Sequence, residues 1–214
     1  MRAPFITFEG GEGSGKSTQI SLLKDFLASK KIDFVITKEP GGTPLGLELR
    51  RLLVEGAADK MDAIAEALLF FADRRIHLSQ KVWPALDEGK WVISDRFADS
   101  TMAYQYYAYN KRLSKEDIEM LYRFVAADFK PDLTLILDID PEIGLKRSFA
   151  KAATMTVQET RNENRVLTWH QNLRRGYLEI AKENKERCIV LDANVDVEVL
   201  HKQIVNIFKE RFGL

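Results

Sequence analysis

The chain has 214 residues, 45% of them hydrophobic and 30% charged, which is typical of a globular protein, and we expect one cytoplasmic domain over residues 1–214. Its 32 lysines and arginines balance 32 aspartates and glutamates, and this neutral charge argues against a general nucleic-acid binder. The single cysteine, Cys188, excludes an internal disulfide, and the longest stretch without charged side chains, the eleven residues 100–110, is too short for a membrane span.

Short apolar runs alternate along the chain with longer amphipathic segments. The apolar runs, rich in β-branched and aromatic residues, predict strands at 5–8, 34–36, 91–93, 133–137 and 188–191. The longer segments predict helices at 16–29, 63–86, 115–127, 165–183 and 197–208. This alternation predicts an α/β fold, a five-stranded parallel sheet flanked by helices. Ligands bind beyond the carboxyl ends of such strands, so we expect functional residues near Gly10, Glu39 and Asp95.

A glycine-rich motif follows the first predicted strand and opens the first predicted helix. The pattern G-x-x-x-x-G-K-[ST] indicates a phosphate-binding loop in this setting, because glycines let backbone N–H groups turn toward phosphate oxygens. Lys16 would reach the β- and γ-phosphates, and Ser17, with Asp95, would hold Mg²⁺. The residues expected to bind ATP here are Gly10, Gly11, Glu12, Gly13, Ser14, Gly15, Lys16, Ser17 and Thr18. The alternative is a glycine-rich turn that binds nothing.

The phosphate loop alone does not name a reaction, since switches, motors and kinases share it. The D-x-x-G and N-K-x-D motifs of GTPases do not occur in the sequence. A small chain with a second polar site favours a kinase of a small substrate. A regulatory P-loop ATPase stays open as an alternative.

Two further motifs carry a family resemblance. The segment 95–105 reads DRFADSTMAYQ, and 37–46 reads TKEPGGTPLG. Together with the phosphate loop they resemble the signature blocks of bacterial thymidylate kinases, and the resemblance continues in order to residue 178. It implies a P-loop nucleoside monophosphate kinase fold with a mobile lid, transfer of the γ-phosphoryl group of ATP to thymidine 5′-monophosphate (dTMP) with Mg²⁺, and a homodimer. Another nucleoside monophosphate kinase is the enzymatic alternative.

The resemblance also implies roles for residues of the acceptor site. Arg96 and Arg50 would hold the dTMP phosphate, and Glu39 would lie beside the phosphate and metal. The remaining members would surround the nucleoside: Phe70 stacks on thymine, Arg74 hydrogen-bonds it, Ser100, Thr101 and Gln105 line the base pocket, and Tyr104 lies against the deoxyribose. The alternatives are a solvated Arg50, and core packing of Phe70 with Arg74 at the surface. Asp73 would pair with Arg74 or Arg75.

A lid is expected over about 147–164, with a mobile middle at 150–158. The phosphate loop contains no arginine, so the sequence resembles the family type whose catalytic arginine lies in the lid, and Arg161 would be that residue. Arg147, also expected to contact ATP, and Lys151 are the alternatives. Glu12 would orient the sugar 3′-hydroxyl or a lid arginine. No general base is needed, because a phosphate monoester with a second pKa near ~6 is already nucleophilic at pH 7.

Overall fold

The computed structural model describes residues 2–57, 59–109, 111–154 and 161–214. Their strands form one parallel sheet in the order β2-β3-β1-β4-β5. The strands are β1 (Phe5–Glu9), β2 (Phe34–Lys38), β3 (Trp91–Asp95), β4 (Leu133–Asp138) and β5 (Cys188–Asp192). The predicted α/β class and all five predicted strands are therefore confirmed.

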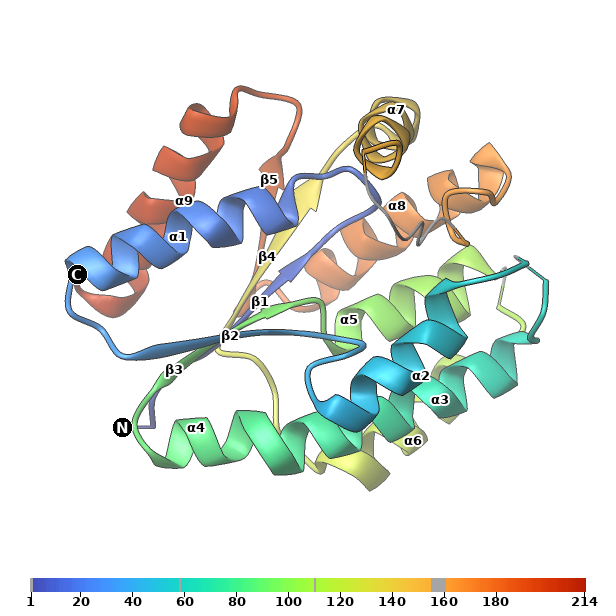
Figure 1. The fold of residues 1–214 in the computed structure, drawn as a ribbon, viewed down its shortest axis with the longest axis horizontal. Coiled ribbons are helices and arrows are strands. Elements are labelled where there is room, and N and C mark those ends of the chain that lie inside the picture. The colour runs from blue at the N-terminus through green and yellow to red at the C-terminus, as the bar shows by residue number, and fades with distance from the viewer. Residues whose placement is uncertain (1, 58, 110, 155–160) are drawn as a thin grey trace.

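Helices cover both faces of this sheet (Figure 1). On one face lie α1 (Lys16–Ser29) and α9 (Val197–Phe212), and on the other lie α3 (Ala63–His77), α4 (Trp83–Asp87) and α6 (Lys115–Ala126). The remaining helical segments are α2 (Pro44–Val54), η1 (Leu78–Val82), α5 (Ala98–Thr101), η2 (Met102–Ala108), α7 (Pro141–Ala152) and α8 (Leu167–Glu183), where η1 and η2 are π-helical turns.

The strands are mostly apolar because their side chains alternate between the two faces of the sheet, and helices cover both faces. Ile6 and Phe8 of β1 pack with α1 and α9, whereas Phe5 packs with α3, α4 and α6. Successive side chains of a strand point to opposite faces, so a strand buried on both faces has few polar positions. β1 has two polar residues, Thr7 in its middle and Glu9 at its carboxyl end. The functional loops begin at this carboxyl end.

The predicted helices were confirmed with two differences. The single helix expected at 63–86 is divided into α3, η1 and α4, and α2, α5, η2 and α7 were not predicted. Helix α7 takes up the beginning of the lid predicted at 147–164. Residues 155–160 of that lid, and with them 155–158 of the predicted mobile middle, lie outside the described residues. In the part of the chain that the structure describes, no helix is long and apolar enough to cross a membrane.

Candidate active site

The loop between β1 and α1 has the geometry of a phosphate-binding loop. Gly10 and Gly13 have φ values of +135° and +68°, and a Cβ atom on them would lie 2.5 Å from the Leu137 carbonyl oxygen and 2.0 Å from that of Gly144, respectively. Only glycine fits both the backbone conformation and the space. The loop leads into the first turn of α1, which contains Ser17 and Thr18 and whose N-terminus favours anions.

Lys16 is held over this loop. Its ammonium donates to the carbonyl oxygens of Gly10 and Gly11, each at 3.0 Å, and to Ser14 Oγ at 3.2 Å. Burial and the nearby Arg96 charge together lower the pKa of Lys16 to about 8, against the opposing effect of Asp95. A buried cation with few anionic partners is well placed to bind a polyphosphate, which would also favour its charged form.

Ser17 and Asp95 offer oxygen ligands beside the loop. Ser17 Oγ donates to Asp95 Oδ2 at 3.3 Å. Among the described residues, no group of three or more histidine, cysteine, aspartate or glutamate side chains could hold a metal ion by itself. Magnesium commonly takes one or two protein oxygens together with phosphate oxygens and water, so this pair fits the cation that accompanies ATP.

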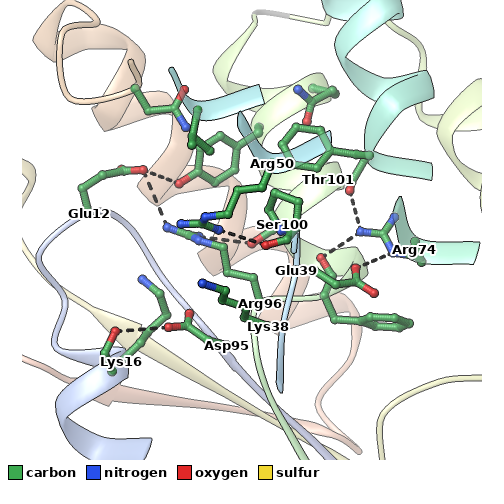
Figure 2. Close-up of a pocket in the computed structure, with 18 of the residues that line it drawn as sticks. Glu12, Lys16, Lys38, Glu39, Arg50, Arg74, Asp95, Arg96, Ser100 and Thr101 are labelled. Carbon is green, nitrogen blue, oxygen red and sulfur yellow. Dashed lines mark hydrogen bonds and ion pairs between the residues drawn. The ribbon is translucent and has the colours of Figure 1, made fainter. Parts of the chain in front are cut away.

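Arg96 connects the phosphate loop to the second half of the site. Its Nη1 donates to the Gly10 carbonyl oxygen at 2.9 Å, to Tyr177 Oη at 2.8 Å and to Ser100 Oγ at 3.1 Å. Figure 2 shows its side chain reaching the middle of the pocket, between Glu12 and Ser100. Its φ of +72° is rare for a residue with a Cβ atom, and such strain is concentrated at functional sites.

Glu12 is a buried carboxylate of the loop that stays ionised. Burial would raise its pKa, but the His170 ring, with Nδ1 3.5 Å from Oε2, the Arg96 charge and the Tyr104 hydroxyl together lower it to about 2. Tyr104 Oη donates to Glu12 Oε1 at 2.5 Å, and Arg96 Nη2 lies 3.6 Å from the same oxygen. Glu12 therefore orients the tyrosine expected at the sugar and the arginine expected at the phosphate.

Beyond Arg96 lies a cavity of about 240 Å³. Its walls come from the phosphate loop, from the segments after β2 and β3, and from α2 and α3. It brings together every residue predicted to bind the acceptor: Glu39, Arg50, Phe70, Arg74, Arg96, Ser100, Thr101, Tyr104 and Gln105. Arg50 is half-buried and donates from Nη1 to the Pro40 carbonyl oxygen at 2.9 Å, which favours its expected place in the site over a solvated side chain.

The base side of this cavity combines an aromatic ring with unsatisfied polar atoms. Gln105 is fully buried, and neither its amide oxygen nor its amide nitrogen has a hydrogen-bond partner among the described residues. The same holds for Arg74 Nη1, although Arg74 is only 1% exposed. Buried polar groups are almost always paired, so these atoms indicate a polar ligand. Phe71 joins the hydrophobic core while Phe70 lines the cavity, so the core-packing alternative for Phe70 and Arg74 is wrong.

One predicted pairing is wrong, and the partners of another carboxylate are now known. The oxygens of Glu39 accept from Arg74 Nε at 3.0 Å and His77 Nδ1 at 2.7 Å (Figure 2). Glu39 lines the same cavity as Lys16 and Asp95, and its place beside the phosphate and metal stays a prediction. Asp73 pairs with neither Arg74 nor Arg75 among the described residues, and its Oδ1 accepts from the Gly41 N–H at 3.1 Å. Both carboxylates therefore have a hydrogen-bond partner from another segment of the chain.

The lid arginine also lies elsewhere than expected. Arg161 is 1% exposed and does not line the cavity; its Nη1 donates to Glu66 Oε1 at 2.9 Å and to the Leu53 carbonyl oxygen at 2.8 Å. In this structure it forms a buried ion pair with Glu66 of α3. Arg147 donates to the Ala193 carbonyl oxygen at 3.0 Å, and Lys151 is exposed.

Sequence reasoning missed three side chains that complete the site. Glu9 lies at the end of β1 and accepts from the Phe97 N–H at 2.8 Å and Ser100 Oγ at 2.6 Å, and its position at a strand end could have identified it. Burial raises the pKa of Glu9 to about 7. Tyr177 and His170 come from α8, where no local motif indicated a role.

A parallel sheet, a phosphate loop and an adjoining cationic acceptor cavity define a P-loop kinase of the nucleoside monophosphate type. The family model for thymidylate kinase matches residues 8–204. The chain belongs to the thymidylate kinase family.

Individual relatives agree over almost the whole chain. The thymidylate kinase of Caulobacter vibrioides is 43% identical over 98% of this chain and 98% of its own. That of Sulfurihydrogenibium sp. is 42% identical over 97% of each chain. The crystal structure of thymidylate kinase from Ehrlichia chaffeensis superposes with a TM-score of 0.75 at 33% identity, covering 97% of this chain and 99% of that one. The resemblance expected from the motifs is therefore confirmed.

Proposed function

We propose that the described cavity is the acceptor site of the family's reaction, in which the γ-phosphoryl group of ATP passes to dTMP and gives thymidine diphosphate for dTTP synthesis. The observation that carries this assignment is the set of buried, unpartnered polar atoms on Gln105 and Arg74 beside Phe70. A flat base with carbonyl and imide groups would stack on the ring and satisfy these atoms. A regulatory ATPase would need no such acceptor pocket.

The chemistry needs charge neutralisation and alignment more than proton transfer. The acceptor phosphate is largely dianionic at pH 7, since its second pKa is near ~6. Arg96 and Arg50 hold this phosphate, and Lys16 cancels charge on the β- and γ-phosphates of ATP. Forked guanidinium groups suit phosphate oxygens better than an ammonium does. Fixed cations would then hold two anions in line at little reorganisation cost.

Magnesium belongs to the same proposal. Ser17 and Asp95 would hold the ion, which when bound neutralises charge on the phosphates of ATP. The loop residues from Gly10 to Thr18, together with Arg147, would bind ATP. Glu12 would orient the 3′-hydroxyl of the sugar through its own carboxylate or through Tyr104, which lies against the deoxyribose.

A cytoplasmic homodimer completes the proposal. Apolar side chains at helical spacing lie exposed on α3 and α6: Ile64 and Leu68 on one, and Met120 and Phe124, the last 88% exposed, on the other. Exposed apolar stripes of this kind mark association surfaces. They support a dimer formed through this side of the protein.

A coupled assay of ADP release with different acceptors tests the function. With ATP and Mg²⁺ present, dTMP should be the best acceptor among dTMP, dCMP, dUMP, AMP, GMP and UMP, and chelation of Mg²⁺ with EDTA should abolish turnover. Best turnover with another monophosphate would replace dTMP by that acceptor. Hydrolysis of ATP that no acceptor stimulates would favour the regulatory ATPase.

A further inference from the structure

A chain of buried hydrogen bonds leads from β2 to the base side of the cavity. Thr37 Oγ1 lies 2.7 Å from His77 Nε2, and His77 Nδ1 lies 2.7 Å from Glu39 Oε1. The other oxygen of Glu39 accepts from Arg74 Nε at 3.0 Å. All four side chains are buried, and His77 is fully so. The acceptor cavity therefore rests on a polar network that the proposed chemistry does not use.

The roles of the atoms in this network follow from the inventory of donors. A carboxylate oxygen of Glu39, which pairs with Arg74, accepts hydrogen bonds, so we assign the hydrogen of this bond to His77 Nδ1. The other ring nitrogen, Nε2, is hydrogen-bonded to the hydroxyl of Thr37, which can donate or accept. Each group fixes the orientation of the next, from the strand to the guanidinium.

The network ends at Arg74, whose Nη1 is a hydrogen-bond donor on the base side of the cavity. Arg74 uses Nε for Glu39, and Nη2 for the Phe97 carbonyl oxygen at 3.2 Å and Thr101 Oγ1 at 2.8 Å. Its Nη1 has no partner among the described residues. Since the guanidinium is planar and rigid, the Glu39 carboxylate, together with Phe97 and Thr101, fixes where Nη1 lies.

The backbone holds the histidine ring in place. A Cβ atom on Gly42 would lie 2.4 Å from His77 Cδ2 and 2.8 Å from Thr37 Oγ1. The glycine thus lets the loop after β2 close directly over the ring and its partner. This contact is independent of the hydrogen bonds, and it limits movement of the ring.

We propose that His77 is a positioning residue for the acceptor base: through Nδ1 it fixes Glu39, and through Glu39 it aims Arg74 Nη1 at the base. The inference rests on the proposed function of the cavity and deepens it. His77 touches neither nucleotide, and its loss acts on recognition of the acceptor and not on the transfer step. A histidine that only filled the core would affect stability without this selectivity.

Two substitutions of His77 separate its two nitrogens. In His77→Asn the amide nitrogen can take the place of Nδ1 and still donate to Glu39, whereas in His77→Gln the longer amide reaches the place of Nε2 and leaves Glu39 without this donor. Both substitutions remove the ring, so the loss of its packing is common to both and does not by itself explain a difference between them. We expect His77→Gln to raise the KM for dTMP about tenfold or more, with kcat and the KM for ATP within about threefold of wild type. His77→Asn should keep the KM for dTMP within about threefold.

Steady-state kinetics on the full chain, with thermal melting of each variant, test whether His77 positions Glu39 and Arg74. An equal rise in the KM for dTMP in both variants, no rise in His77→Gln, or a parallel rise in the KM for ATP would overturn the proposal.

If either variant does not fold, Thr37→Val provides the test, because it keeps the ring and nearly the same volume while removing the hydroxyl that anchors Nε2. It should raise the KM for dTMP alone, and an unchanged value would contradict the relay. A wild-type protein that does not phosphorylate dTMP would instead refute the proposed function.

Discussion

Arg96→Ala should lower kcat/KM for dTMP by about 10²- to 10³-fold, the usual cost of removing one fixed charge-stabilising group from an active site. Arg96 spans the Gly10 carbonyl oxygen, Ser100 and Tyr177, so its loss removes the cation between the phosphate loop and the acceptor cavity. The coupled assay with dTMP as the varied substrate measures the effect.

Two variants control this experiment. Arg96→Lys keeps the charge but loses the fork, and it should give an intermediate value of kcat/KM. Arg175→Ala removes an exposed arginine of α8 that donates to Asn172 Oδ1, and it should have no effect on kinetics. Near wild-type kinetics for a folded Arg96→Ala protein would remove Arg96 from the site.

Arg161→Ala should have its main effect on stability. Breaking a buried ion pair by removing one partner costs about 3–5 kcal/mol, because the other charge stays buried and uncompensated. Here the remaining charge would be Glu66, which is 2% exposed and keeps the Tyr109 hydroxyl as a donor. We expect a loss of about 3 kcal/mol in the free energy of unfolding and a Tm lower by about 10 °C, measured by denaturant and thermal unfolding.

The same variant tests the lid-arginine hypothesis. A catalytic finger predicts a loss of kcat in a protein of nearly unchanged stability, and that result would place Arg161 over the phosphates during turnover. Lys151→Ala is the matched control, since Lys151 is an exposed cation of the lid region. It should leave the Tm unchanged.

The sequence was sufficient to predict those parts of the site in which the backbone conformation allows only one type of residue. Gly10 and Gly13 are required by their positive φ values and by the carbonyl oxygens against them, so a short motif identified the loop. The buried strands were recognisable because both of their faces are apolar. The acceptor residues came from the family resemblance, and the cavity does bring them together.

Side-chain pairs between segments that lie far apart in the chain could not be predicted from the sequence. Glu39, which follows β2, pairs with Arg74 and His77 of α3. Arg161, in a turn before α8, pairs with Glu66 of α3. A pattern of local residue types gives no signal for such pairs. A carboxylate in a functional motif can therefore have its partners on a helix far away in the sequence, as Glu39 has on α3.

A crystal structure of the protein soaked with dTMP tests the central claim most directly. The account predicts thymine on the Phe70 ring within hydrogen-bond distance of Gln105 and Arg74 Nη1, and the phosphate on Arg96, facing Lys16. If dTMP instead occupied another cavity, or left the amide of Gln105 without a partner, the assignment of the acceptor site would be contradicted.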